Sequence, residues 1–225
     1  MYKGGDAVIN KAAANQAKKF KTKELTTTDA DFGEMTTGTV VLAAHGSRDQ
    51  LPSGKTLGIA LGKKTPEQIV ELLTGNKDKK KNLSRDFTGT VLLSGCFTAA
   101  GGIAPEGNYD YDTFAGKVWK LLQAKGIKCK VSGLPGTAFT DAEGKKSSVK
   151  PTEQKAYDAL KKEFAALEKA IEKLGPQLKS KDPKVLALVN KKIKEMNVRM
   201  KEIKAEKETK KMKELIMNYG LDPVR

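Results

Sequence analysis

Side chains that carry out covalent chemistry are scarce in this sequence. The 225-residue chain has one histidine, His45, and two cysteines, Cys96 and Cys129. A single imidazole excludes the zinc sites that need two histidines, and we expect no metal site. Two cysteines are too few for a disulfide framework, so we expect two reduced thiols and ask whether either is reactive.

Long hydrophobic runs are also missing. No apolar run approaches the roughly 18 residues that would suggest a membrane span. Residues 1–20 lack the apolar stretch of a signal peptide. We therefore expect a protein that is made in the cytoplasm and has no membrane span. If it acts elsewhere, for example inside a host cell, a non-standard secretion route delivers it.

Acidic residues are too few to balance the basic ones, because 42 Lys and Arg face 27 Asp and Glu and leave a net charge of +15. Such a charge favours nucleic acid, anionic lipid headgroups, a polyphosphate or an acidic partner, and the alternative is a solvated lysine-rich surface without a partner. Nearly all of the basic residues are lysines, and aromatic residues make up only 6% of the chain. Specific nucleic-acid modules depend on arginine and exposed aromatic rings, so this composition argues against nucleic acid as the partner.

Three apolar runs have the length and composition of buried strands, at residues 39–44, 88–95 and 127–133. Helical patterns separate them, one opening at the cap Thr65-Pro66 and one covering residues 111–125. Strands that alternate with helices in this way predict an α/β fold with a mainly parallel sheet flanked by helices.

The composition changes near residue 151. Residues 1–150 complete the α/β pattern with a helix over 7–20 and a hairpin that turns at Glu143-Gly144. Residues 151–225 are rich in lysine and carry apolar residues three and four positions apart, which predicts a C-terminal helical hairpin with these residues at its seam. The predicted seam residues are Tyr157, Leu160, Phe164, Leu167, Ile171, Leu174, Val189, Ile193, Met196, Met200, Ile203, Met212, Leu215, Ile216 and Tyr219.

The histidine and one cysteine follow two of the predicted strands. His45-Gly46 comes after the first strand, and Ser94-Gly95-Cys96 ends the second. Parallel strands end at the same edge of a sheet, so the sequence predicts that the imidazole and the thiol meet there. A thiolate of Cys96 with His45 as the base is the arrangement of acyl-transfer catalysis, and the N–H groups of Gly46 and Cys96 would bind the oxyanion. Cys129 shares a strand face with other apolar residues and is predicted to be core.

These two blocks, an apolar run followed by His-Gly and an apolar run followed by a small residue and Cys, resemble the signature of the caspase-like cysteine peptidases. That group includes caspases, legumains, gingipains, clostripain and separase. The segments LSGC at residues 93–96 and VSGLPGTAFTDAEGK at residues 131–145 most resemble the autoprocessing domains of large bacterial toxins. The resemblance covers roughly residues 35–150.

The resemblance implies a caspase-like fold and a cysteine endopeptidase that cuts itself or a partner protein, as a bacterial effector or toxin fragment does. It implies an orienting acid upstream of the histidine, for which Asp31 is preferred to Asp29. No required cofactor is implied. Toxin domains are activated by inositol hexakisphosphate in a basic cleft, and the candidate residues for it here are Lys79, Lys80, Lys81, Arg85, Lys145 and Lys146.

Two other interpretations remain open from the sequence. In the first, the α/β part is catalytically inactive, and the lysine-rich hairpin binds an acidic protein, nucleic acid or a membrane surface. In the second, the thiol enzyme is retained, but another nucleophile resolves the acyl-enzyme, which gives transpeptidation or deamidation.

Overall fold

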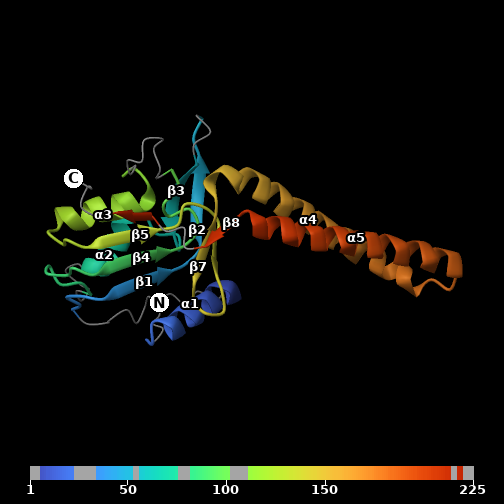
Figure 1. Cartoon of the computed structure of the whole chain (residues 1–225), viewed down its shortest axis with the longest axis horizontal. Coiled ribbons are helices and arrows are strands. Elements are labelled where there is room, and N and C mark those ends of the chain that lie inside the picture. The colour runs from blue at the N-terminus through green and yellow to red at the C-terminus, as the bar shows by residue number, and fades with distance from the viewer. Residues whose placement is uncertain are drawn as a thin grey trace. The chain divides into compact units, whose positions relative to one another are not determined.

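The computed structural model describes residues 6–22, 34–52, 56–75, 82–101, 111–213 and 217–219. The chain divides into two compact units (Figure 1). The first unit comprises Met1–Pro151 together with Lys213–Arg225, and the second comprises Thr152–Met212.

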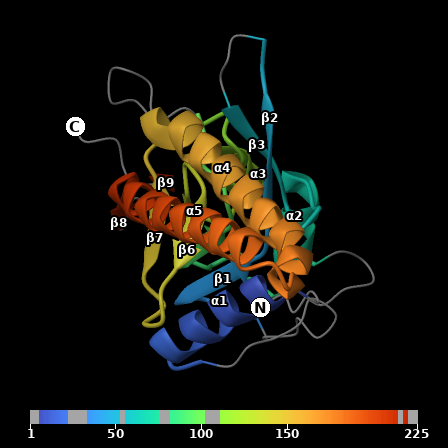
Figure 2. The same ribbon diagram turned by 90° about the vertical axis from the view of Figure 1, so that its right-hand side faces the viewer.

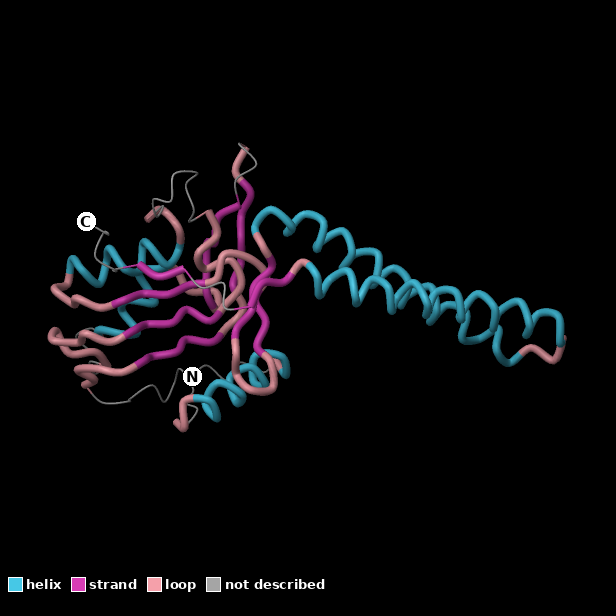
Figure 3. The backbone as a smooth tube through the Cα atoms, viewed as in Figure 1, coloured by secondary structure: helices cyan, strands magenta, loops and turns pink. Residues whose placement is uncertain are grey.

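The first unit is built on a four-stranded sheet, visible as the long magenta segments in Figure 3. Strands β1 (Thr39–Ala43), β4 (Thr90–Ser94) and β5 (Lys130–Gly133) are parallel, and β9 (Met217–Tyr219) joins β5 in the antiparallel direction. The order in the sheet is β1-β4-β5-β9. The predicted mixed α/β fold with a mainly parallel sheet is confirmed.

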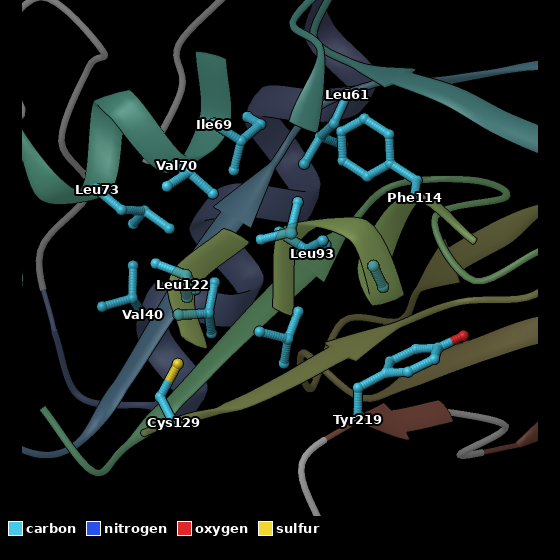
Figure 4. Packing of buried hydrophobic residues seen from close by; sticks show 14 of the residues in the cluster. Val40, Leu61, Ile69, Val70, Leu73, Leu93, Phe114, Leu122, Cys129 and Tyr219 are labelled. Carbon is cyan, nitrogen blue, oxygen red and sulfur yellow. The ribbon is translucent and has the colours of Figure 1, made fainter. Parts of the chain in front are cut away.

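One face of this sheet carries the hydrophobic core, which also includes side chains from α2 (Pro66–Thr74) and α3 (Phe114–Ala124) (Figure 4). The predicted cap of α2 forms as a capping box, in which Thr65 Oγ1 accepts from the Gln68 N–H and the Gln68 side chain accepts from the Thr65 N–H. The fully buried members of this core include Leu73, Phe87, Val91, Leu93, Phe114, Val118, Leu122, Val131 and Tyr219.

The opposite face of the sheet receives α1 (Ala7–Lys19). Successive residues of a strand point to opposite faces, so Ser94 faces away from the core that contains Leu93. The Ser94 hydroxyl donates to Gln16 Oε1 of α1 at 3.1 Å, and both residues are buried. Asp6 is the N-cap of helix α1, and its carboxylate accepts from the Val8 N–H at 2.7 Å.

Two antiparallel hairpins complete the first unit. Strands β2 (Gly46–Gln50) and β3 (Thr56–Leu61) form one of them, and β6 (Ala138–Thr140) and β7 (Lys146–Val149) form the other. The second hairpin turns through Gly144, which has a φ of 76°, so the predicted turn at Glu143-Gly144 is confirmed.

The second unit is helical. After the short helix η1 (Pro151–Glu153), it contains α4 (Gln154–Leu174), η2 (Gly175–Lys179) and α5 (Pro183–Thr209). Helices α4 and α5 contact each other, and both are seen in Figure 2. Among the described residues, no helix combines the length and the apolar character that crossing a bilayer requires.

The expected continuation of the helical seam to Tyr219 is wrong. Helix α5 ends at Thr209, β8 (Lys211–Lys213) follows, and Met217–Tyr219 is a strand of the main sheet. Residues 213–225 therefore belong to the first unit. The expected boundary had assigned the whole of 151–225 to the helical unit. The physical reason is burial, because Tyr219 is fully buried and its hydroxyl accepts from Thr113 Oγ1 at 2.7 Å. Leu215 and Ile216 lie outside the described residues.

The buried position of Tyr219 gives a prediction about the stability of the fold. Tyr219→Phe leaves the Thr113 hydroxyl without this buried partner, so we expect a loss of about 1 kcal/mol in the free energy of unfolding. Tyr219→Ala removes the ring as well and should cost about 3–5 kcal/mol. Urea denaturation measures both. Val198→Ala, at a side chain that is 51% exposed, is the control, and a Tyr219→Ala cost no larger than that of the control would contradict the packing of β9.

Candidate active site

The turns that carry His45 and Cys96 lie side by side. They follow β1 and β4, which are neighbouring parallel strands with Ala43 paired to Ser94. A Cβ atom on Gly46 would lie 1.8 Å from the Cys96 carbonyl oxygen. Only glycine therefore allows the two turns to touch, and the backbone places the histidine turn against the cysteine turn at the carboxyl edge of the sheet.

The Cys96 thiol is half-buried, and within the described part of the chain it has a polar contact with the hairpin that follows. Its Sγ accepts from the N–H of Ala138 in β6 at 3.3 Å. Within the described residues, the N–H of Cys96 itself donates to no acceptor. An unpaired N–H beside a partly exposed thiol is one element of an oxyanion hole.

The residue after the cysteine is held in an uncommon conformation. Phe97 has a φ of 61°, a left-handed value that bulky residues rarely adopt. Its N–H donates to Gly136 O at 3.0 Å, the backbone of Gly58 abuts its carbonyl group, and the Arg48 guanidinium lies 4.5 Å from its ring centroid. Strain of this kind persists only where the surroundings enforce it, and it is typical of functional turns.

His45 is paired with a carboxylate that the sequence did not reveal. Its Nε2 lies 2.6 Å from Oδ2 of Asp6, with the two side chains 60% and 44% exposed. The hydrogen bond to His45, followed by that from the Val8 N–H, lowers the pKa of Asp6 below its usual value. Asp6 thus caps α1 and orients the imidazole, whereas the expected acid Asp31 and its alternative Asp29 lie outside the described residues.

Asp6 left only a partial signal in the sequence. An aspartate directly before a helical pattern indicates an N-cap. Its meeting with a histidine 39 positions away arises from the packing of α1 on the sheet, and no local pattern reports such a contact.

No hydrogen bond joins the imidazole of His45 to the thiol of Cys96 among the described residues, since the ring contacts Asp6 and the thiol contacts Ala138. Catalytic hydrogen bonds are often long before substrate binds. The described residues contain no group of three His, Cys, Asp or Glu side chains that could hold a metal ion. This edge of the sheet therefore carries a partly exposed thiol after β4 and, after the neighbouring β1, an imidazole held by Asp6.

The residues expected to bind a polyanion are dispersed. Arg85 is exposed in the segment that enters β4, at the other end of that strand from Cys96. Lys145 is exposed and lies 2.7 Å from the Glu143 carboxylate. Lys79, Lys80 and Lys81 lie outside the described residues.

Lys146 is the exception, because it is only 6% exposed. Its ammonium group donates to Thr140 Oγ1 across the β6–β7 hairpin. Burial lowers the pKa of Lys146 to about 8, a negative charge on Cys96 opposes that shift, and Lys19 adds to it. Lys146 therefore belongs to the interior near Cys96 and not to a solvated lysine loop.

A pocket of about 390 Å³ lies beside Lys146, on the face of the sheet that α1 covers. Among the residues that the structure describes, two lysines line it, together with the side chain of Gln16, whose buried Nε2 has no hydrogen-bond partner there. No carboxylate is found among the described lining residues. The lining residues are Gln16, Lys19, Phe20, Thr39, Thr90, Leu92, Ser132, Gly144, Lys146 and Asn218.

No protein-family model matches the chain, and no curated protein is significantly similar to it. The arrangement around His45 and Cys96 is therefore the ground for a functional assignment.

The two cysteines should differ in reactivity. Cys129 is 4% exposed within the core, and burial raises the pKa of its thiol to about 11. Cys96 is half-buried. We expect iodoacetamide to alkylate Cys96 at least about tenfold faster than Cys129 in the folded chain, as followed by peptide mass spectrometry, and the difference to vanish in urea. Equal rates in the folded chain would contradict the described burial.

Lys146 gives a prediction on pH dependence. Because its pKa falls to about 8 on folding, the unfolded chain binds more protons between about pH 8 and pH 10.5, and stability rises with pH in that window. Lys146→Met should remove this rise and stabilise the chain at pH 7 by up to about 3 kcal/mol. Urea denaturation at pH 7 and pH 10 tests it, with the exposed Lys128→Met as control. If the free energy of unfolding of Lys146→Met still rises between pH 7 and pH 10 as in the wild type, the burial of the ammonium group is contradicted.

Proposed function

We propose that the protein is a cysteine endopeptidase of the caspase-like type, in which Cys96 is the nucleophile and His45 transfers the protons. Its substrate is a peptide bond in its own chain or in a partner protein, as in bacterial effectors and toxin fragments. The observation that carries the proposal is the contact between the His45-Gly46 turn and Cys96 at the ends of adjacent parallel strands.

In the first half of the reaction, the Cys96 thiol gives its proton to His45 and the thiolate attacks the substrate carbonyl carbon. The carbonyl oxygen becomes an oxyanion that accepts from the N–H of Cys96, with the Gly46 N–H as the second candidate donor. The C–N bond then breaks, and the imidazolium protonates the leaving amine. A thioester on Cys96 remains.

In the second half, His45 takes a proton from water, and the resulting hydroxide attacks the thioester carbonyl. The C–S bond breaks, the imidazolium returns its proton to the Cys96 thiolate, and a carboxylic acid is released, which restores the enzyme. Asp6 supports both halves, because a carboxylate 2.6 Å from Nε2 stabilises the imidazolium that forms in each. The described contacts of the Asp6 carboxylate are with the His45 ring and with the N–H groups of Val8 and Ile9, so its role is one of positioning.

The caspase-like assignment is supported by the order of the elements. Strand, His-Gly turn, neighbouring strand and Cys turn follow one another as the resemblance of residues 35–150 requires. The β6–β7 hairpin that follows the nucleophile also occupies the residues that resemble the toxin domains.

A peptide bearing a thiol-reactive acyloxymethyl ketone tests the assignment. We expect it to label Cys96 of the wild-type chain and to label His45→Ala at least about 100-fold more slowly, because general acid–base catalysis contributes about 10²–10⁴-fold. The labelling site is read by mass spectrometry across peptides that vary the residue before the reactive group. Cys129→Ala serves as the matched control and should be labelled at the wild-type rate.

Iodoacetamide gives the comparison rate in the same variants, since it needs no oxyanion hole. If His45→Ala lowers the labelling rate of the peptide reagent by no more than it lowers that of iodoacetamide, His45 has no catalytic role. If no peptide labels Cys96 with or without a polyanion, the endopeptidase proposal fails.

We also propose a polyphosphate such as inositol hexakisphosphate as an activator that binds the pocket beside Lys146. The support comes from the described lining residues, which include two lysines, no carboxylate, and Gln16 with an Nε2 that has no hydrogen-bond partner among them. A bound phosphate would supply acceptors to all three groups and restore the charge of Lys146.

Inositol hexakisphosphate should therefore raise the rate at which the peptide reagent labels Cys96, and Lys146→Met should remove that increase. Lys128→Met should keep it, since Lys128 is exposed outside the pocket. If the compound changes no rate while His45 dependence persists, the activator proposal fails and the endopeptidase stands.

A further inference from the structure

The seam between α4 and α5 is only partly covered. Tyr157, Leu160, Val189 and Ile203 are buried. The other described seam residues are half-buried: Phe164, Leu167, Ile171, Leu174, Ile193, Met196 and Met200. Two helices alone cannot enclose an apolar stripe of this length, and bundles usually close it with further helices.

One side of the seam is closed by an ion-pair cluster. The Arg199 guanidinium makes a two-pronged contact with Glu163 of α4, at 2.8 and 3.1 Å, and also binds Glu202 and Glu206 of α5. This fork fixes the register of the two helices.

The other side of the seam carries lysines over aromatic rings in place of an ion-pair cluster. At 3.6 residues per turn, Lys204 lies about 140° from Arg199 around α5, on the far side of the seam. The Lys204 ammonium is 5.4 Å from the Phe164 ring centroid, and the Lys207 ammonium is 5.2 Å from that of Tyr157. We call Lys161, Lys204 and Lys207, with the rings of Tyr157 and Phe164, the lysine edge.

The lysines of this edge are close enough to affect one another. Burial, followed by the positive charges of Lys211 and Lys161, lowers the pKa of Lys207; Glu208 opposes the shift and Lys204 adds to it. Such crowding costs free energy that a negatively charged partner would recover.

We propose that the lysine edge is a docking site for an acidic amphipathic helix of a partner protein. Its carboxylates would pair with the three lysines, and its apolar face would cover the half-buried seam at Phe164, Leu167 and Met200. A third helix in the groove between two others is the ordinary geometry of helix bundles.

The charge of the second unit argues against a second copy as the occupant. Residues 152–212 hold 17 Lys and Arg against 10 Asp and Glu, a net charge of +7, so two such units repel each other. Nucleic acid would satisfy the lysines but leave the apolar seam in water, which favours a protein helix.

Fluorescence anisotropy on the full chain tests the proposal with a labelled helical peptide of repeating Leu-Glu-Glu-Leu-Leu-Glu-Glu sequence. A peptide of the same composition in scrambled order is the reference. We expect the patterned peptide to bind more tightly, and Lys204→Glu with Lys207→Glu to weaken it by about tenfold or more. Circular dichroism checks that the variant stays helical.

The matched control is Lys184→Glu with Lys191→Glu, which makes the same charge change at exposed positions of α5 away from the lysine edge. It should keep at least about half of the wild-type affinity. Equal binding of the scrambled peptide, or equal loss in the control variant, would overturn the proposal. So would tighter binding to duplex DNA or to phosphatidylserine vesicles than to the patterned peptide, with the same dependence on Lys204 and Lys207.

Discussion

The contact between the backbones of Gly46 and Cys96 is the constraint on which the site depends. It exists because β1 and β4 pair in parallel and end together, and because no Cβ atom stands between the two turns. A side chain at position 46 would push the turns apart and carry the imidazole away from the thiol. The proposed chemistry thus rests on a steric property of one glycine and on the direction of two strands.

The parts around this contact hold the cysteine turn from several sides. Gly136 accepts from the Phe97 N–H, Ala138 donates to the thiol, and the hydroxyl of Thr98 accepts from the Leu134 N–H at 2.9 Å. These bonds keep Phe97 in its left-handed conformation. The same segment leads into the β6–β7 hairpin that buries Lys146, so the pocket beside Lys146 is connected to Cys96 through the hydrogen bond from the Ala138 N–H.

The sequence allowed the prediction of those features that local patterns encode. The strand that precedes His45, the cap at Thr65 and the core position of Cys129 follow from apolar runs, capping chemistry and alternation. Asp6 beside His45 and the burial of Lys146 depend on where α1 and the β6–β7 hairpin pack, which no local pattern records. The strand at Met217–Tyr219 was not predicted. It is only three residues long and pairs with β5, which is far away in the sequence, and the spacing of its apolar residues from those of the preceding helix also fits a continued helix.

The most direct test of the account is the detection of the thioester that it requires on Cys96. Intact-mass spectrometry after rapid mixing of the chain with a peptide p-nitrophenyl ester should reveal one acyl group on Cys96 that forms within the dead time and then decays. The adduct should be absent from Cys96→Ala and slow to form and to decay in His45→Ala. An acyl group that forms at the same rate without His45, or that appears on Cys129 or on lysines instead, would contradict the account.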